Sequence, residues 1–331
     1  MDRHLEIVRL LADGNVHSGE AIAARLGISR AAVWKAVRKA ADTLGIDVDS
    51  LRGRGYRLRQ PLELLDTGAI KHKLPESILR QISRIDLLDA VDSTNSWLMR
   101  GAGHGALTGS VCLAERQSAG RGRRGRAWVS PFGANIYLSI LWRYPLAPAE
   151  LGGLSLAAGV AVARALETAG ARDIGLKWPN DLHWHRRKLA GLLLEVGGES
   201  HGPSHVVVGV GVNLWLDPLL AVAINQPWTD LNTVLGGKAY RRNDLVALLI
   251  AELCSALEGY GANGLEPFLS DWQRLDAYLG EPVQLLVGER HIDGVYAGIE
   301  SSGALLLEVD GELRAFHGGE VSVRPRPRFG A

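Results

Sequence analysis

The first sixty residues carry the pattern of short helices that most narrows the fold of this chain. Apolar residues recur at helical spacing in three successive segments, 7–11, 22–26 and 33–44. Ser18 and Ser29 stand where helix N-cap residues would, and Gly27 supplies a turn between the second and third segments. Helices joined through such a turn predict a helix-turn-helix.

A glycine-rich hairpin is expected directly after the third helix. Strand-like residues at 48–51 and 56–58 flank the tip Arg52-Gly53-Arg54-Gly55, as in the wing of a winged helix-turn-helix. The stretch 25–59 holds nine basic and three acidic residues, although the whole chain has a net charge of +1. This local charge predicts a DNA-binding module, with contacts from Ser29, Arg30, Trp34, Lys35, Arg38, Arg52 and Arg54. Trp34 fits equally well as a packing residue, so no base contact is assigned to it.

The rest of the chain divides into two regions with different sequence patterns. With 331 residues the chain is too long for one hydrophobic core, and Pro61 interrupts the strand pattern. Strands are expected at 136–142, 188–196 and 206–212, and helices at 154–169 and 243–260. Short strands with glycine-bearing turns follow residue 272, and 324–329 is expected to be an unstructured end. We therefore expect an α+β protein with a winged helix-turn-helix (1–62), a mixed α/β domain (66–272) and a small SH3-like β-barrel (273–325).

The cysteines and the N-terminus indicate a cytoplasmic protein. Cys112 and Cys254 are far apart and lack the spacing of metal ligands, so both are expected to be buried thiols in a reducing compartment. The start of the chain lacks the pattern of a signal peptide, and no unbroken apolar run has the length of a membrane span. No membrane association is expected.

Two polar segments of the central region have the composition of a ligand site. Asp92-Ser93-Thr94-Asn95 follows an apolar run, and its groups could bind a small polar ligand or cap a helix beginning near Ser96. In the segment 120–126 four arginines alternate with three glycines, which suits close approach to a phosphate or carboxylate. Its glycines spell G-x-G-x-x-G, but a strand rather than a helix is expected next, so a Rossmann site is excluded.

A third segment places two lysines on either side of an expected turn. Lys177-Trp-Pro-Asn180-Asp181 is followed by Arg187-Lys188-Leu-Ala-Gly191. A lysine can neutralise charge on a transferring phosphate, although surface exposure is the simpler interpretation of both lysines. His183 and His185 are expected to be exposed loop residues, because no third zinc ligand is evident and no metal site is predicted.

Together these motifs resemble those of one enzyme family. The segments 120–128 and 130–135 resemble the biotin-binding loop of biotin–protein ligases, and 177–181, 187–191 and 92–95 are similar to that family's other signatures. The N-terminal segments 18–32 and 54–56 are similar to those of the bifunctional members, which also repress biotin operons. The resemblance covers nearly the whole chain.

The resemblance implies a reaction and a set of residues. Biotin would be activated by MgATP to biotinyl-5'-AMP, which serves as intermediate and corepressor, and then transferred to a lysine of the biotin carrier protein of acetyl-CoA carboxylase. The expected catalytic residues are Lys188, Arg123, Lys177 and Asp181. The expected ligand-binding residues are Ser93, Thr94, Asn95, Gln117, Gly120, Arg121, Gly122, Arg123, Trp128, Asn180, Lys188, Asn213 and Trp228. Asn180 and Asp181 could each bind metal, bind ribose or orient a lysine.

The resemblance also implies partners and leaves alternatives. A homodimer promoted by the adenylate would bind operator DNA. A lipoate or octanoyl–protein ligase is the nearest alternative enzyme, and a ligand-sensing repressor without ligase activity is an alternative of another class.

Overall fold

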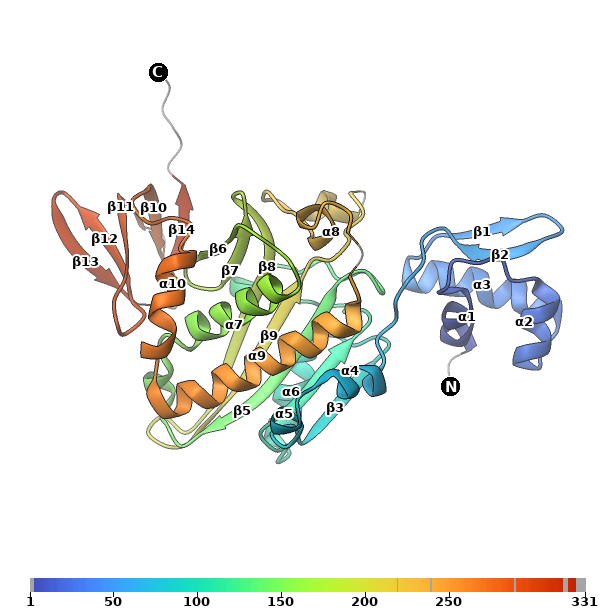
Figure 1. Cartoon of the computed structure of the whole chain (residues 1–331), viewed down its shortest axis with the longest axis horizontal. Helices are drawn as coiled ribbons and strands as arrows, with labels where there is room; N and C mark the ends of the chain where they lie inside the picture. The colour runs from blue at the N-terminus through green and yellow to red at the C-terminus, as the bar shows by residue number, and fades with distance from the viewer. Residues whose placement is uncertain (1–2, 219, 239, 289, 318–320, 326–331) are drawn as a thin grey trace, which may run out of the picture.

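Three units follow one another along the chain in the computed structural model, which describes residues 3–218, 220–238, 240–288, 290–317 and 321–325. The N-terminal unit and the C-terminal sheet lie at opposite ends of a larger central α/β unit (Figure 1). The prediction of an α+β protein is therefore confirmed, and the domain boundaries at residues 62, 66 and 272 stay predictions.

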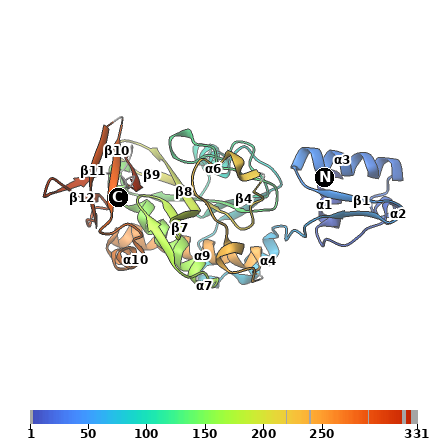
Figure 2. The same cartoon turned by 90° about the horizontal axis from the view of Figure 1, so that it is seen from above.

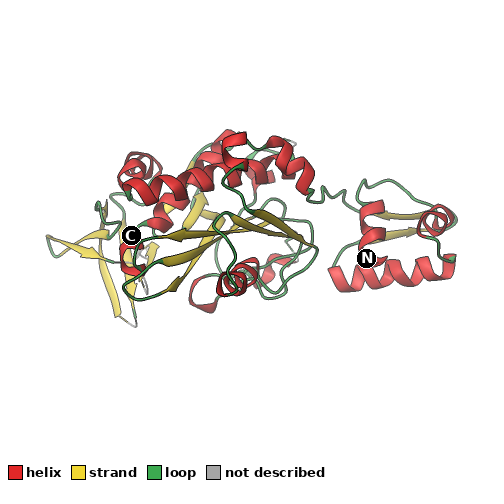
Figure 3. Ribbon diagram, turned by 90° about the horizontal axis from the view of Figure 1, so that it is seen from below, coloured by secondary structure: helices red, strands yellow, loops and turns green. Residues whose placement is uncertain are grey.

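The N-terminal unit has the predicted winged helix-turn-helix elements. Its three helices and two strands are α1 (Arg3–Leu11), α2 (Gly19–Leu26), α3 (Arg30–Leu44), β1 (Val48–Leu51) and β2 (Gly55–Leu58). The Ser18 and Ser29 hydroxyls cap α2 and α3 by accepting from Ala21 N and Ala32 N. The unit stands apart from the central sheet and is joined to it by an extended linker (Figure 3).

The central unit is built on a seven-stranded sheet with the order β3-β4-β5-β9-β8-β7-β6. All neighbouring strands are antiparallel except the parallel pair β3 and β4. The strands are β3 (Arg84–Leu88), β4 (Ser110–Ala114), β5 (Ile136–Tyr144), β6 (Ile174–Lys177), β7 (Asp181–Trp184), β8 (Arg187–Gly198) and β9 (Ser204–Val212). The expected strands at 136–142, 188–196 and 206–212 are β5, β8 and β9.

Helices cover the two faces of this sheet unequally. The long helices α7 (Leu154–Thr168) and α9 (Arg242–Asn263) lie on one face, and α6 (Thr94–Gly103) lies on the other (Figure 2). The shorter helices are α4 (Thr67–Lys73), α5 (Glu76–Leu79), α8 (Leu231–Val234) and α10 (Leu269–Leu275). Pro148–Thr168 and Arg242–Asn263 are long and apolar enough to cross a membrane by length and composition. More than half of each apolar window is buried inside the protein, so both segments serve as core helices here.

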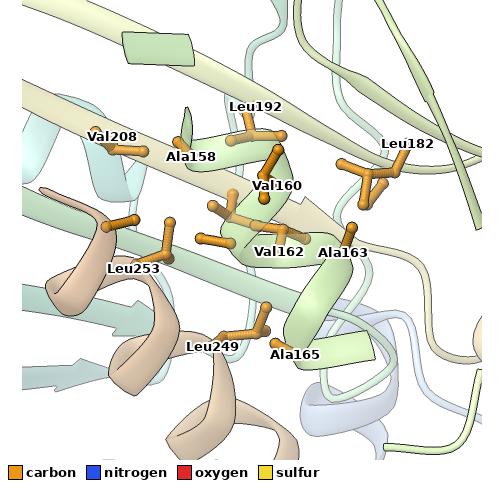
Figure 4. Packing of buried hydrophobic residues seen from close by; sticks show 14 of the residues in the cluster. Ala158, Val160, Val162, Ala163, Ala165, Leu182, Leu192, Val208, Leu249 and Leu253 are labelled. Atoms are coloured by element: carbon orange, nitrogen blue, oxygen red, sulfur yellow. The ribbon is translucent and has the colours of Figure 1, made fainter. Parts of the chain in front are cut away.

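The main core lies between the sheet and the face that carries α7 and α9. Val160, Leu249 and Leu253 on these helices meet Leu192 of β8 and Val208 of β9 in a continuous apolar layer (Figure 4). Side chains alternate between the two faces along a strand, so the residues next to Val208 in β9 point away from the core. Two residues on that opposite face of β9 are glycines, Gly209 and Gly211. The face opposite the core is therefore hollow at the centre of the sheet.

The C-terminal unit is a five-stranded antiparallel sheet with the order β13-β12-β11-β10-β14. Its strands are β10 (Pro282–Val287), β11 (Arg290–Ile299), β12 (Leu305–Val309), β13 (Glu312–Phe316) and β14 (Val321–Pro325). The expectation of an unstructured end from residue 324 is wrong for its first two residues, because β14 pairs with β10 as far as Pro325. Residues 326–329 of that expected segment lie outside the described residues.

A buried ion pair fastens the linker after the N-terminal unit to the central unit. Glu115 and Arg242 bond to each other, and their side chains are only 4% and 5% exposed. Glu115 also accepts from Leu65 N at 2.6 Å, while Arg242 donates to the Asn135 carbonyl at 2.7 Å. Arg242 also donates to the Glu63 carbonyl at 3.2 Å. One pair of charges thus fixes the linker, the end of β4, the start of β5 and the start of α9 together.

The loop that follows the arginine–glycine segment touches the N-terminal unit. Phe132 is 3% exposed and belongs to the apolar cluster of that unit, together with Leu58 and the partly buried Leu62. Nearby, the Arg116 guanidinium donates to the carbonyl of Thr43 at the end of α3. The N-terminal unit therefore rests on segments that flank Gln117 and Trp128.

Candidate active site

The hollow in the sheet is made by glycines under the Trp128 ring. A Cβ atom at Gly211 would lie 2.5 Å from Cε2 of Trp128, and one at Gly191 would lie 3.3 Å from the same ring. A Cβ atom at Gly209 would lie 2.0 Å from Oδ1 of Asn95. Side chains at these positions would fill the space, so the glycines of β8 and β9 create the floor of the site.

The N-terminus of α6 supplies the polar wall of this hollow. Gln117 Oε1 accepts from Thr94 N at 2.9 Å and from Thr94 Oγ1 at 3.2 Å, and Gln117 Nε2 donates to Ser130 Oγ at 3.2 Å. Buried Ser139 lies with its Oγ 2.7 Å from Thr94 Oγ1 and 2.6 Å from Asn95 Oδ1. These bonds hold a set of donors and acceptors in fixed positions beside the pocket.

The segment 92–95 caps a helix and also contributes to the pocket wall. Ser93 is the N-cap of α6, which begins at Thr94 rather than near Ser96 as expected. Thr94 and Gln117 line the first pocket, whereas Ser93 and Asn95 are buried behind it. Asn95 Nδ2 donates to the Leu193 carbonyl at 3.0 Å and to Glu195 Oε2 at 2.9 Å, so Asn95 supports the wall.

Two pockets lie side by side and share one wall. The first has a volume of about 130 Å³, and the second, about 840 Å³, is lined by the segment 223–228 and by Asn213. Trp128, Lys177 and Lys188 line both. The first also contains the predicted residues Thr94, Gln117, Arg121, Gly122, Arg123, Asn180 and Asp181, and the second contains Trp228.

A lysine–carboxylate pair stands at the junction of the pockets. Lys188 Nζ lies 2.7 Å from Asp181 Oδ1 and 5.5 Å from the centroid of the Trp128 ring. Burial disfavours the ionised Asp181, but the Lys188 ammonium outweighs it and holds the pKa of Asp181 below its usual range. Lys177 is 7% exposed, so the simpler interpretation of the two lysines as surface residues is wrong. The junction is a buried cationic site with one balancing carboxylate.

The arginine–glycine segment covers the first pocket. Arg121 Nη2 lies 3.2 Å from Glu195 Oε1 and donates to Ser96 Oγ at 2.8 Å. Burial lowers the pKa of Arg123, while the nearby Asp181 carboxylate opposes that shift. Gly120 lies behind the pocket, where a Cβ atom would come within 2.6 Å of Ser130 Oγ. The next long element after this segment is the strand β5. A Rossmann site would need a helix there, so the structure agrees with the exclusion of such a site.

The second pocket is closed by a segment that pairs with the Lys188 backbone. Lys188 N donates to the Pro227 carbonyl and Thr229 N to the Lys188 carbonyl, both at 2.9 Å. Asn213 Nδ2 donates to the Thr229 carbonyl at 3.1 Å. The chain around Trp228 is thereby tied to the strand that carries the central lysine.

The expectation that His183 and His185 are exposed loop residues holds at only one of the two positions. His185 is exposed in the turn after the strand, but His183 is 6% exposed and lines the second pocket. The expectation that His183 is an exposed loop residue is therefore wrong. Within the described ranges, no cluster of three or more His, Cys, Asp or Glu side chains could hold a metal ion.

Several residues of the site were not predicted from the sequence. Those that line the pockets include Gly209, Gly211, His183, Arg186 and Tyr278. Ser139 and Glu195 bond to the residues of the pocket wall. Two of these carried a usable signal, because Gly209 and Gly211 alternate with valines and leave one face of a strand bare. The others come from separate segments that only the folded sheet brings together.

The predicted DNA-contacting residues lie on exposed surfaces of the N-terminal unit. Arg30, Lys35 and Arg38 are exposed on α3, and Arg52 and Arg54 are exposed at the wing tip. Trp34 is 47% exposed, and the Arg38 guanidinium lies 5.0 Å from its ring centroid. Ser29 uses its hydroxyl to cap α3. Their assignment to DNA contact stays a prediction.

Replacing Gly211 with alanine is expected to weaken binding of the small ligand at least about 10-fold. The added methyl group would overlap the Trp128 ring, which must then leave its place over the pocket floor. Titration calorimetry with biotin, the ligand that the sequence resemblance implies, measures the effect. Gly259→Ala is the control, because its Cβ atom would meet nothing closer than 3.9 Å. Equal affinities for the two variants would contradict the role given to the glycine floor.

Comparison with known proteins agrees with this architecture. Residues 88–213 match the biotin/lipoate A/B protein ligase family, residues 3–57 an HTH domain, and residues 278–324 the biotin protein ligase C-terminal domain. The bifunctional ligase/repressor BirA of Salmonella typhimurium is 43% identical over 97% of both chains, and that of Escherichia coli is 42% identical over the same shares.

A solved structure shares most of this fold. The biotin protein ligase of Aquifex aeolicus, in complex with biotin and ATP, is 29% identical with a TM-score of 0.63. The match covers 74% of this chain and 100% of that one. With its helix-turn-helix unit and its similarity over nearly the full length of the curated relatives, the chain belongs to the family of bifunctional biotin–protein ligases and repressors.

Proposed function

We propose that this ligase activates biotin with MgATP and transfers it to a lysine of the biotin carrier protein of acetyl-CoA carboxylase. The observation that carries the proposal is the wall that the two pockets share. The smaller pocket, with the fixed polar groups of Thr94 and Gln117, suits the ureido ring of biotin. The larger pocket suits a nucleotide, and Lys188 stands between them where the reacting groups would meet.

The first step forms the mixed anhydride at this junction. A carboxylate oxygen of biotin attacks the α-phosphorus of ATP, the bond from that phosphorus to the bridging oxygen breaks, and pyrophosphate leaves with the electron pair. Lys188 and Lys177 place positive charge where negative charge collects. In the second step the carrier amine attacks the acyl carbon, loses a proton, and AMP departs with the electrons of the broken C–O bond.

The remaining predicted residues either cover the first pocket or offer oxygen atoms to Mg²⁺. Arg121, Gly122 and Arg123 cover the first pocket, which would keep water from the anhydride. Mg²⁺ would arrive with the nucleotide, because it binds through substrate phosphates and one or two protein oxygens. Asp181 offers a carboxylate for it, and Asn180, whose Nδ2 donates to the Leu192 carbonyl, offers its amide oxygen.

Pyrophosphate release tests the substrate class directly. The purified protein with MgATP is expected to release pyrophosphate when biotin is added and not when lipoate or octanoate is added at equal concentration. Release with lipoate alone would assign the chain to the lipoate-ligase alternative. Tight binding of biotin without any release would favour the repressor that lacks ligase activity.

We further propose that biotinyl-5'-AMP acts as corepressor for biotin biosynthesis genes. Binding to operator DNA should weaken about 10³-fold or more between 50 and 200 mM salt, because phosphate contacts release counterions. Fluorescence anisotropy measures this dependence. Arg52→Ala and Arg54→Ala together should reduce the slope by about two. The control is Arg57→Ala, because that side chain is paired with Asp49 at 3.2 Å. An unchanged slope in the double variant would remove the wing tip from the interface.

Dimerisation is proposed to depend on the ligand. If biotinyl-5'-AMP favours the DNA-competent dimer, it must bind that state more tightly than the monomer. Sedimentation of the protein with and without the adenylate is expected to show tighter self-association with it. Identical sedimentation in both conditions would refute ligand-promoted pairing.

We place this activity in the cytoplasm. Cys112 and Cys254 are buried free thiols, as suits a reducing compartment, and the carrier protein and operator DNA would be found there.

A further inference from the structure

His183 lies in the cationic wall of the second pocket. It is on β7, directly opposite Lys188 on β8 and two residues after Asp181, so the three side chains share one face of the sheet. Lys177 on β6 is paired with Asp181 and adjoins the same group. The imidazole therefore belongs to the surface that the proposed nucleotide would meet.

One nitrogen of this imidazole has no bonding partner. Among the described residues nothing accepts from or donates to His183 Nε2, which is buried. The other nitrogen, Nδ1, lies 3.5 Å from the Tyr278 hydroxyl, and the two rings meet edge to face at 6.1 Å. A buried polar atom without a partner costs free energy, so its retention calls for a ligand or another role.

The contact with Tyr278 favours one role for the second nitrogen. When the Tyr278 hydroxyl donates to Nδ1, the ring proton resides on Nε2. His183 then offers a hydrogen-bond donor beside Lys177 and Lys188.

We propose that His183 donates a hydrogen bond from Nε2 to a phosphate oxygen of the nucleotide's polyphosphate chain. Arg186 stacks on Tyr278 at 4.4 Å and pairs with Glu281 at 2.9 Å, and it forms the outer side of the same subsite. His183 lines the second pocket but not the first, so its contact falls on the side away from biotin, toward the leaving pyrophosphate. This inference rests on the proposed ligase function.

Two substitutions separate a hydrogen bond from packing. His183→Phe keeps a ring against Tyr278 but removes the donor, and it is expected to raise the KM for ATP about 10-fold or more. His183→Gln places an amide N–H near the position of Nε2 and is expected to recover most of that loss. Both constants come from pyrophosphate release at saturating biotin. His185→Phe is the control, because His185 is exposed and does not line the second pocket.

The outcomes separate the inference from the proposed function. A His183→Phe variant that melts and binds biotin like the wild type, yet shows an unchanged KM for ATP, overturns the inference alone. Equal losses in the Phe and Gln variants also overturn it, because they indicate a packing role. Inorganic pyrophosphate, tested as an inhibitor, is expected to bind less tightly to the Phe variant. If the wild-type protein itself releases no pyrophosphate with biotin, the proposed function fails first.

Discussion

Replacing Lys188 with alanine is expected to slow biotin activation by about 10²-fold or more. The Lys188 ammonium stands at the junction of the two pockets, where the carboxylate and the α-phosphate would meet. Loss of one preorganised charge-stabilising donor typically costs a factor of 10² to 10³ in rate. Single-turnover release of pyrophosphate measures the chemical step separately from product release.

Two controls make that result specific. Lys73→Ala removes a surface lysine whose ion pair with Asp244 is 3.4 Å long, and it should leave the rate unchanged. Lys188→Ala also leaves Asp181 without its nearest cation, so the double variant Lys188→Ala/Asp181→Asn removes the resulting uncompensated carboxylate. Near-normal turnover in Lys188→Ala would refute the role of this lysine. Recovery of the full rate in the double variant would show that the single change acted only through Asp181.

Replacing Arg242 with alanine is expected to lower the free energy of unfolding of the central unit by about 3–5 kcal/mol. The change leaves the buried Glu115 carboxyl group without its cation, and breaking such a buried pair costs far more than breaking an exposed one. Urea unfolding followed by tryptophan fluorescence measures the shift. The control is Arg80→Ala, which breaks an exposed ion pair with Glu76 and should change stability by less than about 0.5 kcal/mol.

The same variant is expected to loosen the linker as well. Arg242 donates to the Glu63 carbonyl and Glu115 accepts from Leu65 N, so both groups hold the segment after the N-terminal unit. Hydrogen exchange at residues 62–66 should become faster in Arg242→Ala than in Arg80→Ala. A stability loss equal to that of the surface control would mean that the buried pair is not a structural anchor.

Local features of the fold could be predicted because they depend on neighbours in the sequence. Ser18 and Ser29 cap the helices that follow them, and the wing strands surround a glycine-rich tip. Apolar runs predicted the longest strands and helices, because a fully buried element is apolar throughout. For the candidate site, Thr94, Gln117 and Lys188 do line the pockets, and they were found through motifs similar to those of a known family.

The contacts that depend on chain topology could not be predicted. Glu115 and Arg242 are 127 positions apart, and no local pattern indicates that they form a pair. The sequence around Phe132 indicates only an apolar residue in a loop. In the structure Phe132 belongs to the apolar cluster of the N-terminal unit. No local pattern predicts the burial of His183, which contacts Tyr278 from a distant segment. Long-range packing decides the environment of each of these side chains.

The most direct test of the account is the mass of an acceptor protein after reaction. The purified chain is incubated with MgATP, an apo biotin-carrier domain, and either biotin or lipoate. A biotinyl adduct is expected on one lysine of the carrier, and it should require ATP and be strongly reduced in Lys188→Ala. An unmodified carrier in the presence of bound biotin, or a lipoyl adduct in place of the biotinyl one, would contradict it.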